Sequence, residues 1–394
     1  MTAVLGGGGP AAAPRSAFVH VVAALVGLHA CMAATRVAAS LAVLQQGYAD
    51  WVVGLLLSLY AVAPIVLSLW AGRLADRFGF HRPVSWAVAM ALLGAAMPVL
   101  TQHIAAIAFS GLLTGGAVSV AAVAIQREAG LMARDPDDLK RVFSWVSLGP
   151  ALSNMGAPVL TGLVIDHLGF RAAFAFGALL PLWALWSAWR VPRQPTLPGA
   201  GTSPRAAGRA LELLRMPVLR NVLLVNIAMA AAWDAHSFTV PVVGHARALS
   251  ASAIGLVLGS FALAATIVRL ALSTFARHVD EPRVLRVAIT LATAVLAVYA
   301  WLPGAWGMML GSALLGVALG SVQPMVLSML HQAAPADRQG QVLALRMLFT
   351  NAATISMPAG FGLLAAVTST AAPMWAMAGL LLLARWPVSR LRLR

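Results

Sequence analysis

The stretch GRLADRFGFHRP, from Gly72 to Pro83, decides how the fold of this chain is interpreted. It is a compact charged island between two long apolar runs, because Trp51–Ala71 and Val84–Leu100 carry no charged side chain. About 20 helical residues, rising about 1.5 Å each, cover the ~30 Å hydrocarbon core of a bilayer. The island is therefore interpreted as a short loop between two membrane-spanning helices.

The composition of the whole chain supports this interpretation. Apolar side chains make up 60% of the 394 residues and charged side chains only 10%, whereas soluble domains carry about a quarter charged residues. Apolar segments long enough to span a bilayer recur from Phe18 almost to the C-terminus, without the short alternating strands of a membrane barrel. The sequence predicts an all-α polytopic membrane protein.

Twelve spans are expected. They cover residues 18–43, 49–71, 84–102, 104–125, 142–165, 171–189, 218–243, 252–276, 284–302, 306–330, 342–366 and 371–388.

The net charge of +15 is typical of nucleic-acid binders, but its distribution favours a topology signal. Of the 27 Lys and Arg residues, all but five lie in loops and tails on one side of the predicted membrane. The positive-inside rule places that side, with both termini, in the cytoplasm of a cell (inner) membrane protein.

Four regions are expected along the chain. Residues 1–17, rich in Gly, Pro and Ala, form a disordered tail. Residues 18–190 and 218–394 form two six-helix bundles, joined by a Pro-, Gly- and Arg-rich cytoplasmic linker at 191–217. The end of the linker, 205–215, could form a short amphipathic helix on the membrane surface.

An internal repeat supports two related bundles. The matched features are LLTGGAVSV (112–120) with LLGVALGSV (314–322), and Pro158 and Gly162 with Pro358 and Gly362. All are offset by about 200 residues in the same order. Two pseudo-symmetric halves of this kind would place a substrate site at their interface, near the middle of the membrane.

From about Phe18 to Trp386, the chain resembles the major facilitator superfamily. The resemblance is strongest in the charged island, where Gly72, Asp76, Arg77, Gly79 and Arg82 match that family's signature between its second and third helices. It implies a cytoplasmic gate whose contacts hold the outward-facing state and break as the halves rock. We expect Gly72 and Gly79 to permit a close helix approach and a tight turn.

Two further residues, Arg127 and Glu128, belong to this predicted gate. Glu128, at the cytoplasmic end of the fourth span, is a candidate partner for Arg77 or Arg127.

The departures from the family pattern concern proton-linked exporters. Their fourth-helix Arg, four residues before a Gly, is replaced by Gly111 here, and in the fifth span Gly149–Pro150 is followed by Ser153–Asn154 instead of a Gly pair. The antiporter signature is partial. Bends are still expected at Pro150, Pro158 and Pro358.

Ionisable groups inside hydrocarbon cost ~3 kcal/mol or more, so each is a candidate for the transport pathway. Asp234 is the only acid well inside a span; it could carry a proton, balance a cationic substrate, or form a structural pair with Arg36. Arg36, Arg269 and Arg346 outnumber it, so an anionic substrate would supply the missing charge. Arg269 and Arg346 could instead snorkel to the cytoplasmic surface.

His29, midway along the first span, could carry a proton or simply pack. Trp233 could stack on an aromatic or cationic ligand. Asn154, Gln323 and Asn351 could line the pathway or serve only as interhelical hydrogen-bonding groups. Asn226 shares a helical face with Trp233 beside Asp234, and His236 could form a hydrogen bond nearby.

Other chemistry leaves no sequence signal. We find no Walker loop, dinucleotide fingerprint or Cys/His metal-ligand set, and Cys31 is the only cysteine, so we expect no enzyme activity, metal or cofactor. The favoured interpretation is a monomeric secondary active transporter that exports or exchanges a small organic solute with protons. The alternatives are organic-anion uptake, a facilitated carrier, and a non-transporting membrane sensor or scaffold.

Overall fold

The computed structural model describes residues 15–132, 136–193, 211–275, 280–334 and 339–389, and within these it contains only helices, turns and loops. The helices are α1 (Arg15–Gln45), α2 (Asp50–Phe78), α3 (His81–Leu100), α4 (Ile104–Met132), α5 (Pro136–Ala188), η2 (Leu211–Arg215), α7 (Pro217–Ala246), α8 (Ala251–Phe275), α9 (Glu281–Val298), η4 (Tyr299–Trp301), α10 (Gly304–Ala333), α11 (Gln339–Val367) and α12 (Ala372–Ser389).

Helix α5 contains two of the predicted spans. Its backbone leaves the helical region at Gly169, where φ is 81° and ψ is 178°, a conformation that glycine adopts without the steric cost of a Cβ. Gly169 lies between the fifth and sixth predicted spans. With α5 divided there, the described residues form the twelve long helices that the apolar runs predict, and ten segments, α5 counted once, are long and apolar enough to cross a bilayer.

Several helix boundaries differ from the expectation; α4, for example, continues to Met132 and does not end at residue 125. Helix α1 begins at Arg15, before the predicted start at Phe18, and α2 continues to Phe78, through half of the charged island. Of the predicted amphipathic helix, 205–210 lie outside the described residues, and Leu211–Arg215 form a 3₁₀ turn whose Leu213 is buried among core residues of α7 to α12.

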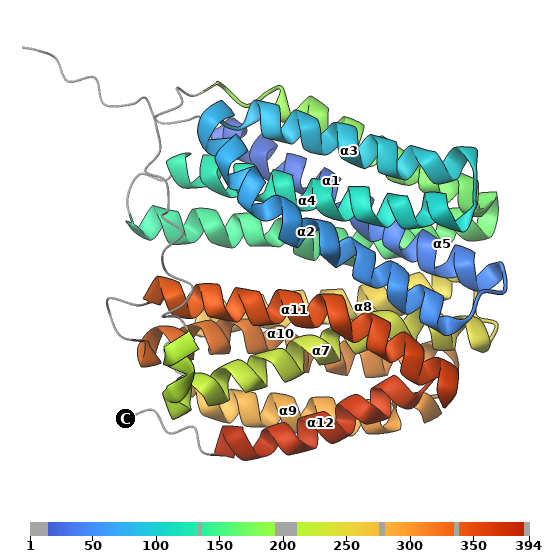
Figure 1. The fold of residues 1–394 in the computed structure, drawn as a ribbon, viewed down its shortest axis with the longest axis vertical. Helices are drawn as coiled ribbons and strands as arrows, with labels where there is room; N and C mark the ends of the chain where they lie inside the picture. Colours follow the sequence, from blue (N-terminus) through green and yellow to red (C-terminus); the bar gives the residue numbers. More distant parts are fainter. Residues whose placement is uncertain (1–14, 133–135, 194–210, 276–279, 335–338, 390–394) are drawn as a thin grey trace, which may run out of the picture.

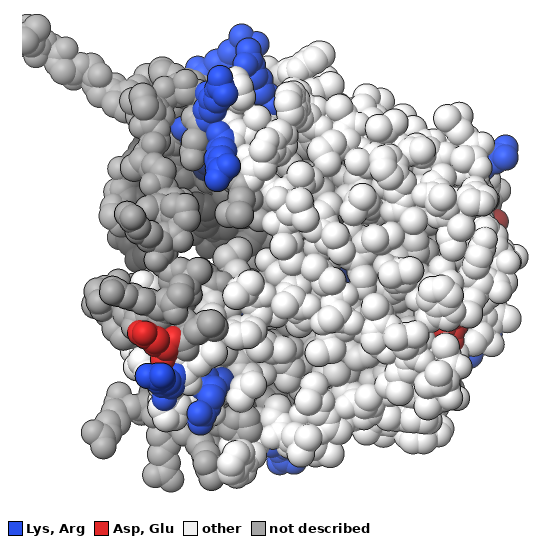
Figure 2. Space-filling view, viewed as in Figure 1, with Lys and Arg blue, Asp and Glu red and all other residues white. Residues whose placement is uncertain are grey.

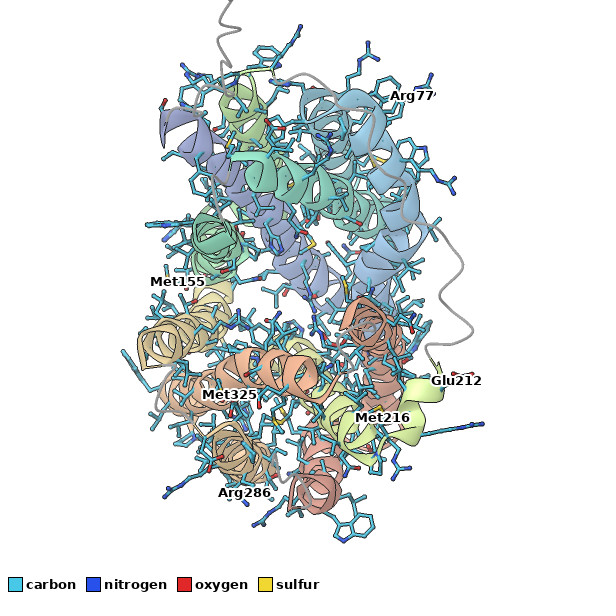
Figure 3. All side chains as sticks on the ribbon, turned by 90° about the vertical axis from the view of Figure 1, so that its left-hand side faces the viewer. Arg77, Met155, Glu212, Met216, Arg286 and Met325 are labelled. Carbon is cyan, nitrogen blue, oxygen red and sulfur yellow. The ribbon has the colours of Figure 1, made fainter. Side chains whose placement is uncertain are left out.

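The helices are arranged as two bundles that lie side by side (Figure 1). One apolar core lies within α1 to α5, and a larger one runs through α7 to α12 and continues into parts of α1, α2, α4 and α5. The bundles meet mainly along two helix pairs, α2 with α11 and α5 with α8, and α7 also contacts α1 and α2. A view along the helices shows the same division (Figure 3).

Charge separates the two ends of the molecule. Lys and Arg gather at one end on both bundles (Figure 2), and Arg77 and Arg286 point outward there on opposite bundles (Figure 3). We call this the basic end. The opposite end carries the turns at 46–49, 101–103, 247–250 and 368–371.

Two close helix crossings join the bundles at the opposite end. A Cβ added to Gly54 on α2 would collide with the carbonyl oxygen of Pro358 on α11, and a Cβ added to Gly255 on α8 would collide with that of Pro158 on α5. Only glycine allows backbones to approach so closely. We call these crossings the α2–α11 seam and the α5–α8 seam.

The two seams are copies of each other. Gly362 faces the backbone of Trp51 in the α2–α11 seam as Gly162 faces that of Ala251 in the α5–α8 seam. The glycines and prolines of one seam are offset by 200 or 201 residues from those of the other, so the repeat seen in the sequence is a repeat of contacts. Away from the seams, toward the basic end, the bundles diverge (Figure 1).

Candidate functional site

Two adjoining cavities lie beside the seams, and both are lined by Trp233 of α7. The first, the interface cavity, measures about 60 Å³ and is lined by α1 and α5 of one bundle and α7 and α8 of the other. The second, the large cavity, measures about 350 Å³ and is lined by α7, α8, α10 and α11. Its size is in the range of small-molecule sites.

Most of the predicted pathway residues line one cavity or the other. In the interface cavity these are Arg36, Asn154, Trp233 and His236. In the large cavity they are Asn226, Trp233, Asp234, Arg269, Gln323 and Arg346. His29 and Asn351 are the exceptions: His29 is half-buried away from both cavities, and Asn351 is exposed on α11.

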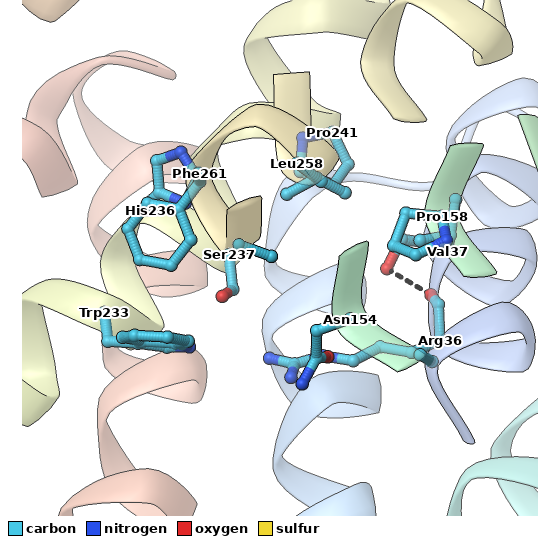
Figure 4. A pocket seen from close by; sticks show the side chains of 13 residues that line it. Arg36, Val37, Asn154, Pro158, Trp233, His236, Ser237, Pro241, Leu258 and Phe261 are labelled. Atoms are coloured by element: carbon cyan, nitrogen blue, oxygen red, sulfur yellow. Dashed lines mark hydrogen bonds between the residues drawn. The ribbon is translucent and has the colours of Figure 1, made fainter. Parts of the chain in front are cut away.

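Arg36 enters the interface cavity from α1 and extends toward Trp233 on α7, with Asn154 of α5 beside its guanidinium in this view (Figure 4). The side-chain amide of Asn154 donates to the carbonyl oxygen of Pro150, 2.9 Å away. Arg36 is half-buried, and charged groups at such depth in membrane proteins face the interior or a water-filled cavity. The cavity gives this cation an interior position between the two bundles.

Asp234 faces Arg36 across the bundle interface. Its carboxylate interacts electrostatically with Arg36 of the other bundle and accepts a hydrogen bond from the hydroxyl of Thr354. The side chain is only 6% exposed, and its Oδ2 has no hydrogen-bond partner among the described residues. The acid, which lines the large cavity, therefore keeps one buried oxygen without a hydrogen-bond partner among the described residues.

His236 belongs to a packed network. Its Nε2 lies 2.8 Å from the Ser312 hydroxyl, which in turn lies 2.6 Å from the Tyr299 hydroxyl. The imidazole ring stacks on Phe261, with centroids 4.3 Å apart and an interplanar angle of 21°. The nearby hydrogen bond expected for His236 thus goes to α10.

Arg269 and Arg346 bring two guanidinium groups to the large cavity from α8 and α11. Arg269 lies over Trp233, 5.5 Å from the ring centroid, and its Nε donates to the Gly320 carbonyl oxygen at 3.4 Å. The Nε of Arg346 is buried without a hydrogen-bond partner among the described residues. Among the described residues lining this cavity, Asp234 is the only acid.

Thr350 and Thr354 were not predicted from the sequence. Both line the large cavity, where the Asn226 amide donates to Thr350 Oγ1 at 2.9 Å. They follow Arg346 at spacings of four and eight residues, which places the three side chains on one face of α11. That spacing is the signal that could have found them.

At the basic end, part of the predicted gate differs from expectation. Gly79 has a φ of 69° and terminates α2, as the predicted turn requires. Gly72, however, has no atom within 4 Å of a Cβ built on it, so the expected close helix approach is wrong for this conformation. The side chain of Asp76 lies outside the described residues.

Two arginines of this motif form cation–π contacts with the ring of Phe78. The guanidinium carbons of Arg77 and Arg82 lie 5.1 and 4.7 Å from the Phe78 ring centroid. Glu128 is buried, at 2% exposure, and interacts electrostatically with Arg127, one of its two expected partners. Arg77 itself is exposed.

Solved structures share this architecture. A mutant of the nucleoside transporter NupG aligns with a TM-score of 0.78 at 12% identity, covering 95% of this chain and 99% of that one. A bacterial homologue of the iron transporter ferroportin in its inward-facing state aligns at 0.75 and 15%, covering 95% and 98%. A POT family transporter in complex with a thioalcohol-conjugated peptide aligns at 0.74 and 11%, covering 93% and 94%.

Sequence comparison gives the family directly. Among curated protein sequences, none matches this chain significantly. A family model for the Major Facilitator Superfamily matches residues 21–342 and 222–392, which together include almost all of the described chain. The chain therefore belongs to the Major Facilitator Superfamily of secondary transporters.

Proposed function

We propose that this chain is a proton-coupled transporter of the cytoplasmic (inner) membrane that exports or exchanges a small organic solute by alternating access. It acts as a monomer, with the basic end and both termini in the cytoplasm. The observation that carries the proposal is the electrostatic interaction of Arg36 on one bundle with Asp234 on the other, beside the interface cavity that helices of both bundles line. The halves that move are residues 18–190 and 218–394.

The seams support the choice of conformation. Because α2 meets α11 and α5 meets α8 at the opposite end, that end is closed, and a solute would reach the large cavity from the basic end. The positive-inside rule makes the basic end cytoplasmic. The conformation then faces the cytoplasm, and transport requires a second conformation in which both seams separate.

Asp166 provides a lock on the α5–α8 seam. Its Oδ1 accepts a hydrogen bond from the Ala251 backbone N–H at 2.9 Å, and its Oδ2 accepts one from the Ser252 N–H at 2.8 Å. The carboxylate thus caps the first turn of α8 from the other bundle, where the helix dipole favours a negative charge. Both hydrogen bonds must break when the seam opens.

Asp234 couples the second contact to protons. As an ionised carboxylate it attracts Arg36 across the interface; once protonated it loses that attraction. Proton binding therefore weakens one of the contacts that hold the bundles together, and proton release restores it. Solute binding beside Asp234 would alter the same balance.

The test is transport in proteoliposomes with an imposed pH gradient. Organic anions and then cationic drugs are added in turn, and an entrapped pH-sensitive dye reports proton movement that depends on the solute. We expect solute-dependent proton flux in the unmodified protein and none in Asp234→Asn, which keeps the size of the side chain but holds no exchangeable carboxyl proton.

Asp280→Asn is the matched control, because Asp280 caps α9 within one bundle, with its Oδ1 3.3 Å from the Arg283 N–H. Its proton flux should equal that of the unmodified protein. Unchanged solute-dependent proton flux in Asp234→Asn would contradict the proton-carrier role.

A second candidate function is organic-anion uptake or facilitated diffusion. It is favoured by the excess of guanidinium groups over carboxylates at the large cavity. The same liposomes separate the two functions, because a facilitated carrier moves its solute down the solute's own gradient without moving protons.

A further inference from the structure

We propose that the large cavity binds a small organic anion, with its carboxylate or phosphate group on Arg269 and Arg346 and its planar apolar body against Trp233. This inference rests on the proposed function and names the class of solute. It concerns α7, α8, α10 and α11, so the site belongs to one bundle and is reached from the basic end.

The large cavity is lined by more cationic than anionic side chains. Asp234 interacts electrostatically with Arg36 of the other bundle and accepts a hydrogen bond from Thr354. Arg269 and Arg346 are then left without a carboxylate partner among the described residues that line the cavity. Because unpaired cations at this depth are costly, the cavity has a net demand for negative charge that a bound anion would satisfy.

The chemistry of the two groups defines what they hold. A guanidinium presents a planar fork of N–H donors that matches the two oxygens of a carboxylate or phosphate. Arg269 uses its Nε on the Gly320 carbonyl at a long 3.4 Å, and the Nε of Arg346 has no partner among the described residues. Neither side chain forms an ion pair with an acid of the described part of the chain.

Trp233 adds the requirement for an apolar body. Its ring is held by the edge of Phe261, with centroids 4.5 Å apart at 79°, and it separates the interface cavity from the large one. Arg269 lies 5.5 Å from the ring centroid, so an anion bound to Arg269 has the indole beside it. A planar or unsaturated body attached to that anion would pack on the ring.

Polar side chains complete the cavity wall. Gln323 is exposed to the cavity, and Thr350 is held by the Asn226 amide at 2.9 Å. The free Oδ2 of Asp234 can accept one hydrogen bond. A hydroxyl or N–H on the anion would satisfy these groups, whereas a second carboxylate near Asp234 would be repelled.

The test is direct binding to the purified full-length protein in lipid nanodiscs, measured by equilibrium dialysis. Four radiolabelled probes share one ring and differ in charge: benzoate, phenyl phosphate, neutral benzamide and cationic benzylamine. Acetate carries the charge without the ring. We expect benzoate or phenyl phosphate to bind at least about tenfold more tightly than benzamide and benzylamine, and more tightly than acetate.

The variants locate the site. Arg269→Gln and Arg346→Gln should each weaken binding of the anion about tenfold or more, and Arg269→Lys should restore part of the loss, because it keeps charge but not the fork. The matched control is Arg286→Gln, an exposed arginine on α9, which should bind like the unmodified protein. Size-exclusion profiles verify that each variant is folded.

Three outcomes would overturn the inference: benzamide binding as well as benzoate, benzylamine binding in a manner lost in Asp234→Asn, or no anion binding at millimolar concentration. Preference for benzoate over phenyl phosphate, or the reverse, identifies the anionic group. Failure here is distinct from failure of the proposed function. Anion binding without proton flux leaves the site intact, whereas proton flux with a cation and no anion binding removes the site and keeps the coupling.

Discussion

The two bundles repeat each other's contacts at the seams but not the charged residues of the large cavity. At the seams the repeat is close: Gly54 approaches Pro358 as Gly255 approaches Pro158. The motion of a two-bundle transporter requires both seams to open and close together, and equal contacts on both sides of the interface serve that need.

At the large cavity the repeat is lost. With the same offsets, Arg269 corresponds to Ser68 and Arg346 to Val146, so the first bundle has no equivalent pair of guanidinium groups. Because the shared features are the backbone crossings and the unshared ones are the charges, we assign the movement to the repeat and the recognition of solute to the second bundle.

The largest effect on transport is expected when a seam is filled. Gly54→Val and Gly255→Val each place a side chain where even a Cβ collides with the opposing carbonyl, and overpacking of this kind costs about 1–3 kcal/mol or more. We expect transport to fall at least about tenfold in both variants, equally, as measured in proteoliposomes.

Gly156→Val is the control for these variants, because a Cβ on Gly156 meets no atom within 4 Å, and its transport should be close to normal. Loss of transport in only one seam variant would show that the seams are not equivalent.

A smaller effect should distinguish the buried hydrogen bonds of the bundles. Ser312→Ala removes the partner of both His236 and Tyr299, which costs roughly 1–2 kcal/mol of stability. Thr114→Val in the first bundle should cost less, because its contact with Thr35 is long, at 3.4 Å. Thermal unfolding in detergent checks the order, and a larger loss for Thr114→Val would reverse it.

The smallest effect is expected for the Asp166 lock, which among the described residues occurs at the α5–α8 seam alone. Asp166→Asn weakens two hydrogen bonds to α8, but the carboxylate is exposed to solvent, so we expect a shift of only about 1 kcal/mol toward the conformation open at the opposite end. Spin-label distances between the bundles measure that shift. If Asp166→Asn shows no change relative to Asp280→Asn, Asp166 does not hold the α5–α8 seam closed.

Much of the fold follows from the sequence because each span needs a long apolar run. The cavity residues were found for a related reason: a charge such as Asp234 or Arg269 inside hydrocarbon is costly and therefore stands out. Asp166 does not stand out, since it directly follows the fifth predicted span (142–165), at a solvent-exposed position of α5 close to the break at Gly169. Its partners on α8 are 85 and 86 residues away in the chain.

Other features depend on conformation and could not be obtained from one sequence. The glycine of the charged island, Gly72, was expected at a close crossing, but the bundles diverge at that end, and the crossings are made by Gly54 and Gly255 instead. A glycine-rich sequence specifies where helices are able to approach. Which of those approaches is made depends on the state of the transporter.

In alternating access the large cavity is reached in turn from the two sides of the membrane, and labelling of a single cysteine at its wall measures this. Ala230→Cys, in a Cys31→Ser background, places the thiol at the wall of the large cavity. A membrane-impermeant maleimide is applied to right-side-out and to inside-out vesicles. We predict labelling from both sides, with Gly255→Val reducing the reaction from the basic end; labelling from one side only would contradict alternating access.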